Sequence, residues 1–321
     1  MLTVIGEALI DLIESPDSSP AAPHGSYRAR PGGSPLNVAV GLARLDCTTT
    51  LLARVSADAF GRVLAQHASA NGVVLGGPVG VPEPTTLAIV SLDPDGIAAY
   101  SFYVEGAADW QWTPEELRAI PVDSTILHTG SLASWIAPGS TLIAETLQIR
   151  RAGGECVISY DPNVRPALLA GPEDARDRIE PYLRIAHIIK ASDADLAWLY
   201  PDRDPLDSLR EWADSGPDLT VLTRGGAGAT AIAADGTVVE VPAPPVELVD
   251  TVGAGDAFMA GLLAAIHRRG LDRPEALAGL DGALVEQLLI DAGDVAALTC
   301  ERAGAEPPTA AELAAARARR A

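Results

Sequence analysis

The most informative stretch of the chain lies near the C-terminus and reads Val249-Asp250-Thr251-Val252-Gly253-Ala254-Gly255-Asp256-Ala257-Phe258. Its small residues at positions 253 to 255 let the backbone turn tightly into a helix, which we predict over Ala257–His267. The first N–H groups of a helix lie at the positive end of its dipole, so this turn is a candidate anion site. Asp256 beside it suits a general base. The stretch alone is equally compatible with a Gly-rich turn whose Asp favours the helix dipole.

Two common Gly-rich motifs fit this stretch poorly. A dinucleotide-binding fingerprint requires a third glycine where the chain has Phe258. A P-loop requires Gly-Lys-Ser/Thr, but the one lysine of the chain, Lys190, follows Ile188-Ile189. Any phosphate must therefore be bound mainly by arginines and backbone amides.

Length and composition narrow the class of protein. The chain has 321 residues, of which 48% are hydrophobic, and a net charge of −20. This length fits one large α/β domain with a small appendage, or two domains. The acidic excess argues against nucleic acid and anionic membrane surfaces as partners, but not against a locally neutralised anion. Three scattered cysteines, no basic leader and no bilayer-length apolar run lead us to predict a cytoplasmic protein.

Strand-like and helix-like segments alternate along the chain, which favours a parallel sheet covered by helices. The predicted strands are Leu2–Ile5, Thr50–Val55, Thr125–Thr129, Cys156–Tyr160, Ala186–Lys190 and Leu219–Thr223. The predicted helices are one capped by Ser34 with Pro35 at its first position, Ala57–Ala70 and Ser140–Ala152, with capping boxes at Thr113 and Thr309.

One region departs from this alternation. Thr86–Leu92 and Ile97–Val104 flank the turn Asp93-Pro94-Asp95-Gly96, a pattern typical of a β-hairpin. A hairpin without a following helix could be a flap over a site or an ordinary edge of the sheet, and the sequence leaves both open.

Polar residues next to the predicted strands and helices are candidates for binding. Gly32-Gly33-Ser34-Pro35-Leu36-Asn37 opens a helix, and its glycines and Asn37 suit a polyhydroxylated ligand or a simple capped turn. Asp11 lies among apolar residues, where a carboxylate requires hydrogen-bond partners such as sugar hydroxyls or local backbone groups.

Two further candidates follow predicted strands, where ligands of open α/β sheets bind. Arg165 in Asp161-Pro162-Asn163-Val164-Arg165 could neutralise a phosphate or form a surface ion pair. Thr223-Arg224-Gly225-Gly226-Ala227-Gly228 could cradle a nucleotide or form a hairpin turn.

These motifs occur in one order along the chain. The order is Gly-Gly-Ser-Pro-x-Asn, Asp-x-Asn-x-Arg, Thr-Arg-Gly-x-x-Gly, Asp-Thr-Val-Gly-Ala-Gly-Asp and finally Gly304-Ala305-Glu306-Pro307-Pro308. Together they resemble the ribokinase-like (PfkB) carbohydrate kinases, and most of all the fructokinases. The match spans nearly the whole chain, and the Asp250–Asp256 motif is highly specific.

The resemblance implies an α/β, ribokinase-like fold with a central, mostly parallel sheet flanked by helices and a small β lid. It implies a single kinase domain over residues 1–321, with the lid formed by parts of 11–31 and 86–104. ATP and a sugar would meet in a cleft under the lid.

The resemblance also assigns roles to residues. Asp256 would take the proton of the sugar hydroxyl. The backbone amides of Gly253, Ala254 and Gly255 would form the anion hole, and Arg165 would approach the γ-phosphate. The implied sugar-binding residues are Asp11, Gly32, Gly33, Asn37, Phe102 and Asp256. The implied ATP-binding residues are Lys190, Ser192, Thr223, Arg224, Gly226, Gly228, Gly253 and Gly255. Asp195 would organise Mg²⁺ indirectly. A monovalent cation such as K⁺ would be held, mostly through carbonyls, by Asp250, Val252, Thr299, Arg302 and Gly304.

The chain departs from the family pattern in three places. The family's Asn-x-x-Glu is replaced by Ser192-Asp193-Ala194-Asp195, whose carboxylate is one carbon shorter. The arginine that many fructokinases carry near Phe102-Tyr103 is absent, because Val104 and Glu105 follow. The glycine pair is followed by Ser-Pro-Leu-Asn, unlike the Lys-Gly-Ala-Asn pattern of ribokinases.

We therefore predict an ATP-dependent, Mg²⁺-requiring kinase that phosphorylates a small sugar, fructose first. The alternatives are 2-keto-3-deoxygluconate, ribose or a nucleoside as substrate. A non-catalytic sugar- or nucleotide-binding protein on the same fold is disfavoured by the intact Asp256, and a dinucleotide-dependent oxidoreductase by Phe258. We expect a monomer or homodimer with neither nucleic acid nor membrane as a partner.

Overall fold

The structure is a computed structural model that describes residues 1–14, 26–92 and 98–320. Its centre is a nine-stranded sheet, counted over those residues, in the order β15-β14-β13-β12-β11-β10-β1-β4-β6. The strands from β6 to β13 pair in parallel, and β14 and β15 add an antiparallel edge. The strands are β1 (Leu2–Ile5), β4 (Thr49–Leu52), β6 (Val74–Leu75), β10 (Ile126–Gly130), β11 (Val157–Asp161), β12 (Ile188–Ser192), β13 (Leu219–Thr223), β14 (Ala229–Ala233) and β15 (Val238–Val241).

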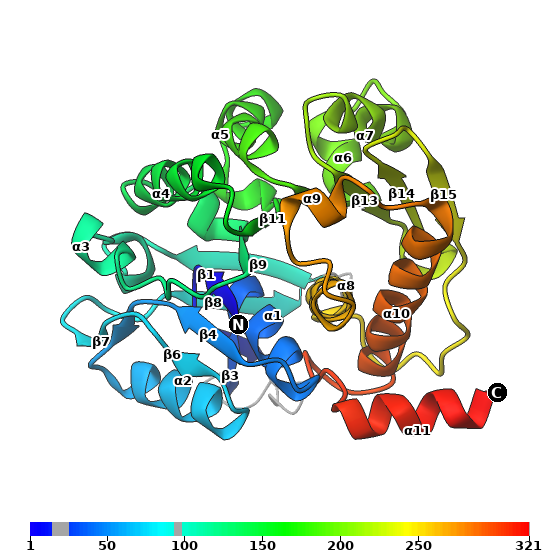
Figure 1. The fold of residues 1–321 in the computed structure, drawn as a ribbon. Coiled ribbons are helices and arrows are strands. Elements are labelled where there is room, and N and C mark those ends of the chain that lie inside the picture. The colour runs from blue at the N-terminus through cyan, green and yellow to red at the C-terminus, as the bar shows by residue number, and fades with distance from the viewer. Residues whose placement is uncertain (15–25, 93–97, 321) are drawn as a thin grey trace.

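Helices cover both faces of this sheet (Figure 1). Side chains alternate across a sheet, so Val157 enters one core layer and its neighbour Ile158 the other. One layer holds α1 (Ser34–Arg44), α2 (Ala59–Ala70), α8 (Ala254–Arg268), α9 (Pro274–Leu277), α10 (Gly282–Cys300) and α11 (Ala310–Arg320). The other holds α3 (Pro114–Leu117), α4 (Gly139–Gly153), α5 (Pro172–Ile185), α6 (Asp193–Leu199) and α7 (Pro205–Ala213).

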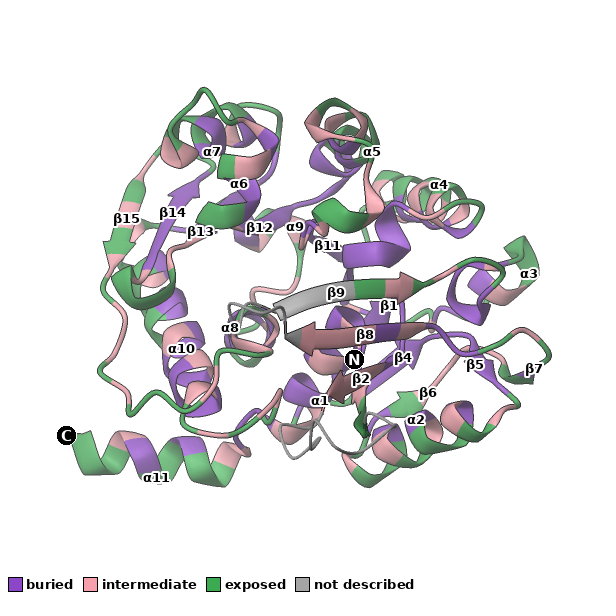
Figure 2. Ribbon diagram, turned by 180° about the vertical axis from the view of Figure 1, so that it is seen from behind, coloured by how far each residue is buried: buried purple, intermediate pink, exposed green. Residues whose placement is uncertain are grey.

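A separate small sheet has the strand order β3-β2-β8-β9. Its strands are β2 (Leu9–Glu14), β3 (Tyr27–Gly32), β8 (Leu87–Leu92) and β9 (Ala98–Tyr103). β8 and β9 pair antiparallel, which confirms the predicted hairpin, although its turn at 93–96 lies outside the described residues. Figure 2 shows β8 and β9 in front of the core, and among the residues of these strands whose burial is described only Ala88 is buried.

Strand boundaries differ from the sequence prediction in an informative way. β1 and β13 begin and end as predicted, whereas β11 and β12 continue to Asp161 and Ser192. The apolar run ends before the hydrogen-bonded strand does, because the last residues of these strands are polar. The predicted strand Thr50–Val55 was wrong as one unit: β4 ends at Leu52, and β5 (Val55–Ser56) pairs with β7 (Val79–Val81) in a two-stranded sheet.

Two helix starts also differ from the prediction. α8 begins at Ala254, three residues earlier than expected, because Gly253 adopts φ 75° as its N-cap. α1 begins at Ser34 with Gly33 (φ 103°) as its N-cap, so the prediction of Ser34 as cap was wrong. The capping boxes at Thr113 and Thr309 are confirmed by their hydrogen bonds to Glu116 and Glu312. Within the described ranges, no helix is both long and apolar enough to cross a membrane.

Candidate active site

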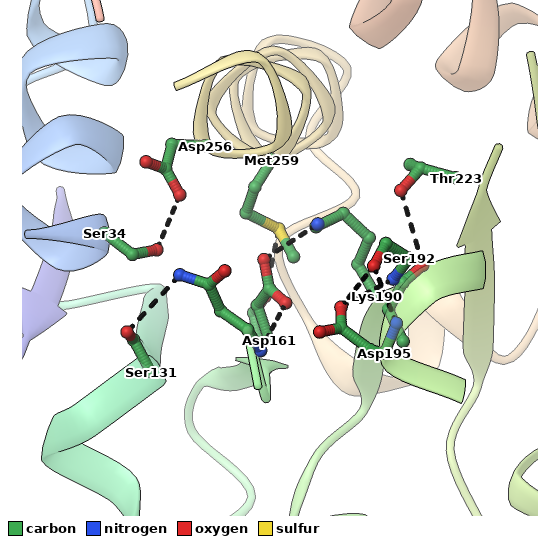
Figure 3. A network of polar contacts seen from close by, with 12 residues as sticks. Ser34, Ser131, Asp161, Lys190, Ser192, Asp195, Thr223, Asp256 and Met259 are labelled. Carbon is green, nitrogen blue, oxygen red and sulfur yellow. Dashed lines mark hydrogen bonds and ion pairs between the residues drawn. The ribbon is translucent and has the colours of Figure 1, made fainter. Parts of the chain in front are cut away.

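Polar residues gather where the parallel strands β11, β12 and β13 end, beneath the N-terminus of α8 (Figure 3). The carboxyl ends of parallel strands share one edge of the sheet, so Asp161, Ser192 and Thr223 come from distant parts of the chain to one place. The first N–H groups of α8 precede its first intrahelical hydrogen bond, which runs from Ala257 N to Gly253 O at 2.8 Å.

Asp256 lies in the first turn of α8 and is held from two sides. Ser34 Oγ donates to its Oδ1 at 2.6 Å, and Asn37 Nδ2 donates to its Oδ2 at 2.8 Å. Burial raises the pKa of Asp256, and these two hydrogen bonds oppose the rise. A carboxylate oriented in this way and more basic than usual is suited to accept a proton.

Ser34 is a residue of the candidate site that the sequence prediction did not name. A serine at the start of a helix often serves as its N-cap. Here Gly33 is the N-cap, so the hydroxyl of Ser34 is free to donate to Asp256. Gly33 itself cannot be replaced easily, because a Cβ there would lie 2.8 Å from Glu7 O. A serine directly after two glycines and before proline is the sequence signal that could have indicated this role.

Asp11, Arg165 and Asp256 lie close enough for their charges to influence one another. Burial raises the pKa of Asp11 to about 6, Arg165 lowers it, and Asp256 raises it further. Arg165 follows the end of β11, and its Nη1 donates to the carbonyls of Asn163 and Val164 at 3.3 and 3.1 Å. The structure thus brings together the predicted base, one predicted sugar ligand and the predicted phosphate-binding arginine.

Lys190 forms a buried ion pair with Asp161, with Nζ 2.8 Å from Oδ2. Burial alone would lower the pKa of Lys190, but the carboxylates of Asp161, Asp195 and Asp256 raise it above its usual value. Burial raises the pKa of Asp161 to about 6, and the charge of Lys190 opposes the rise and favours the ionised form of Asp161. A Cβ on Gly255 would lie 3.4 Å from Lys190 Nζ, which places this ammonium directly beside the first turn of α8.

Asp195 is occupied by local hydrogen bonds. Its Oδ2 accepts from the backbone N–H and the hydroxyl of Ser192 at 2.9 and 2.6 Å. Its Oδ1 accepts from the N–H of Val164 at 2.9 Å, which fastens the loop that carries Arg165 to α6. Over residues 1–14, 26–92 and 98–320, no three His, Cys, Asp or Glu side chains are arranged to hold a metal ion. An indirect role of Asp195 toward Mg²⁺ stays a prediction.

A pocket of about 230 Å³ combines two residue sets that were predicted separately. Its lining includes three predicted sugar ligands, Asp11, Gly32 and Asn37, and three predicted cation ligands, Asp250, Val252 and Gly304. Gly32 must remain a glycine, since a Cβ there would lie 2.2 Å from Asp11 Oδ2. Asp250 accepts from the N–H groups of Gly304 and Val252 at 2.8 and 3.0 Å and so ties two of the pocket's loops together.

Three predicted site residues point elsewhere. The hydroxyl of Thr299 donates to Val295 O within α10, and the guanidinium of Arg302 pairs with Glu312 of α11 at 2.9 Å. Only their backbone carbonyls could serve a cation, and neither residue lines the pocket. Phe102 packs against the core layer of α3 to α7 and does not line the pocket either.

The predicted nucleotide loop forms the turn between β13 and β14. Arg224 N donates to Gly228 O at 2.8 Å, and Thr223 Oγ1 donates weakly to Ala191 O at 3.4 Å. Gly228 adopts φ 99°, and a Cβ there would meet Val241 O at 2.0 Å. Gly226 has open space around it. This segment is a hairpin turn, and its exposed rim is still available to a nucleotide.

Comparison with known proteins now identifies the class. The model of the pfkB family carbohydrate kinases matches residues 1–311. The chain belongs to this family. A fructokinase from Klebsiella pneumoniae is 38% identical over 280 residues, which cover 86% of this chain and 87% of that protein.

Solved structures agree with this membership. The crystal structure of a fructokinase with bound ATP from Xylella fastidiosa matches with a TM-score of 0.88 and 27% identity, and covers 99% of this chain and 98% of that one. A Vibrio cholerae O395 fructokinase variant with fructose, ADP and a potassium ion bound matches with a TM-score of 0.81 and 26% identity over 98% of each chain. The ribokinase-like fold and the carbohydrate-kinase class predicted from the motifs are confirmed.

Proposed function

We propose that this carbohydrate kinase transfers the γ-phosphate of ATP to a hydroxyl of fructose. The observation that carries the proposal is Asp256, half-buried and fixed by Ser34 and Asn37 at the N-terminus of α8, with a cationic Lys190 beside the same turn. The relatives named above, which are fructokinases, support fructose as the acceptor.

In this proposal Asp256 accepts the proton of the attacking hydroxyl. The N–H groups at the start of α8, near Gly255, together with Arg165 and Lys190, balance the negative charge on the transferring phosphoryl group. Asp11 and Asn37 hold sugar hydroxyls at the pocket that they line. The small sheet acts as a lid that excludes water from the reacting atoms.

ATP is the proposed co-substrate, with Mg²⁺ to neutralise phosphate charge and K⁺ near the loops of Asp250 and Gly304. The turn from Thr223 to Gly228 would carry the nucleotide. The hydrogen-bonded carboxylate of Asp195 would act on Mg²⁺ only through the loop it holds or through water. The cytoplasmic location and the monomeric or dimeric state stay predictions.

One observation favours 2-keto-3-deoxygluconate as a second candidate substrate. Arg28 and Arg30 of β3 line the same pocket as Asp11, and neither forms an ion pair within the part of the chain that the structure describes. Guanidinium groups at the pocket suit a carboxylate on the sugar.

A panel of sugars with ATP and Mg²⁺, followed by ADP release, tests both candidates. We expect the highest kcat/KM with fructose. If 2-keto-3-deoxygluconate exceeds fructose, and Arg30→Gln lowers only that activity, the acidic sugar is the substrate. Saturable sugar binding without ADP release would refute the kinase proposal and indicate a binding protein.

A further inference from the structure

Asp109 is a fully buried carboxylate that the proposed chemistry does not use. It lies in the short 3₁₀ helix η1 (Ala108–Trp110), directly after the small sheet ends, and is 1% exposed. Its Oδ1 accepts from Ala8 N at 3.0 Å, and its Oδ2 accepts from Thr86 Oγ1 at 2.6 Å. Neither bond serves η1 itself, so the carboxylate joins segments that are far apart in the sequence.

Both partners of Asp109 stand where the chain enters the small sheet. Ala8 immediately precedes β2, and Thr86 immediately precedes β8. The two strands pair in parallel from Ile10 and Leu87 onward, and Ile10 N donates to Thr86 O at 3.1 Å. One side chain thus fixes the starts of both inner strands of the small sheet relative to each other.

The segment that carries Asp109 is itself fixed to the core. Arg54, in the connection between β4 and β5, donates from Nε to Ala108 O at 3.0 Å. The N–H of Ala108 donates to Pro84 O at 2.9 Å, and Trp110 Nε1 donates to Val104 O at 2.8 Å. Pro84 and Val104 flank β8 and β9, so the connection to the large sheet's side is made by Arg54 and by Trp110, which packs in the core layer of α3 to α7. Asp109 therefore lies at the junction between the small sheet and the core.

The position of Asp109 affects the pocket through β2. Asp11 lies three residues beyond Ala8, and it lines the pocket from β2. A shift of β2 at its first residue moves Asp11 relative to Asp256, which is fixed separately on α8. Catalytic geometry is sensitive to such a shift, because a displacement of about 1 Å can cost roughly 10²-fold in rate.

Burial raises the pKa of Asp109 to about 7, and the bonds from Thr86 and Ala8 and the charge of Arg54 oppose the rise. The other carboxyl facing it is Glu7, also buried, whose pKa is raised to about 7 by its own burial and further by Asp109.

We propose that Asp109 is a positioning residue for the kinase reaction, which acts through Ala8 and Thr86 to set the small sheet, and with it Asp11, against the base on the core. The choice of sugar in its test rests on the proposed function. The placement of the strands by Asp109 does not rest on it, because hydrogen exchange at the starts of β2 and β8 can be measured without any substrate.

Three variants and one control test this role. Asp109→Ala removes both acceptor oxygens, and Thr86→Val removes one of the two donors. Asp109→Asn keeps an oxygen that can accept from the N–H of Ala8 and an amide group that can hydrogen-bond with the Thr86 hydroxyl. His187→Ala is the matched control, because His187 is a buried side chain whose Nδ1 accepts one backbone N–H, from Ile158 at 2.9 Å, away from the small sheet.

For Asp109→Ala we expect a fructose KM raised about tenfold, an ATP KM within about twofold of wild type and more ATP hydrolysed per sugar phosphorylated. Thr86→Val should shift the same quantities less, and Asp109→Asn should restore most of the loss. Hydrogen exchange of β2 and β8 without ligand should be faster in Asp109→Ala and unchanged in His187→Ala.

Equal changes in both KM values, or exchange in β2 and β8 that matches the control, would show that Asp109 only stabilises the fold. If Asp109→Ala does not fold, Thr86→Val decides by the same readouts. If wild type phosphorylates no sugar, the proposed function fails together with any role of Asp109 in the reaction, while the exchange comparison still decides whether Asp109 holds the starts of β2 and β8.

Discussion

The side of the site proposed to bind phosphate lies at the buried carboxyl ends of the central strands, whereas the side proposed to bind sugar lies on the small sheet. On the first side, Asp161 and Lys190 are almost fully buried and paired with each other. On the second, Arg28 and Arg30 are exposed and have no ion-pair partner among the described residues. A change on the phosphate side must therefore disturb stability and catalysis together, while a change on the sugar side can alter substrate choice at little structural cost.

The largest effect is expected where the two sides meet. Asp256→Asn keeps the size of the side chain and can still meet Ser34 and Asn37, but it cannot accept the proton. We expect kcat to fall by ~10²–10⁴-fold with ATP binding and the unfolding midpoint nearly unchanged. Steady-state kinetics and ATP titration measure both. A kcat close to wild type in the purified variant would remove Asp256 from the role of base.

The buried pair provides the next test. Lys190→Met leaves the Asp161 carboxylate buried without its cation, and we expect a loss of about 3–5 kcal/mol in the free energy of unfolding. Denaturant titration measures it. Lys190→Met combined with Asp161→Asn should recover much of the stability but not the activity, because the charge beside Gly255 is still missing. Full activity in the double variant would show that Lys190 is structural only.

Ser34 connects the base to α1, and its loss should have a smaller effect that depends on pH. The hydrogen bond from Ser34 lowers the pKa of Asp256, so Ser34→Ala should raise it. A base with a higher pKa is protonated over more of the acidic range, and the acid limb of the kcat/KM profile should move to higher pH. We expect about a tenfold loss of kcat at neutral pH, since one oriented hydrogen bond to a charged group is worth about 1.5 kcal/mol. Asn37→Ala is the matched variant on the other oxygen, and an unchanged acid limb in both would contradict the assignment.

The sequence predicted the class of fold because it depends on local patterns, and the same patterns marked the candidate site residues. Apolar runs placed β1 and β13, and the Gly-Ala-Gly-Asp stretch predicted that a helix starts there, which the structure confirms. The contacts that could not be predicted join distant segments: Ser34 to Asp256, Asp161 to Lys190, and Asp109 to Ala8. No local pattern encodes such partners, because they are set by the order of strands in the sheet.

The wrong start predicted for α8 also has its cause in a distant segment. Propensity disfavours glycine inside a helix, so the prediction began the helix after the last glycine. The helix starts three residues earlier, after Gly253, whose left-handed φ favours glycine and where a Cβ would lie only 2.5 Å from the Cβ of Ala305. This close approach comes from the loop after α10, which a local reading of positions 249–258 does not include.

The smallest expected effect lies on the sugar side and concerns pH. Burial raises the pKa of Asp11 to about 6 in the free protein, and its carboxylate is the form that accepts hydrogen bonds from sugar hydroxyls. Sugar affinity should therefore be fully present above pH 7 and fall as the pH drops through about 6, with a loss of about twofold between pH 8 and pH 6 when only the ionised form binds. Calorimetric titration of fructose in the presence of ADP measures binding apart from catalysis, so protonation of Asp256 does not enter through kcat. Asp11→Asn should bind fructose more weakly at pH 8 and lose the pH dependence. An affinity in wild type that stays constant from pH 8 to pH 5 would show that Asp11 does not bind the sugar as a carboxylate, and the contrast between a buried phosphate side and an adjustable sugar side would then have to rest on Arg28 and Arg30 alone.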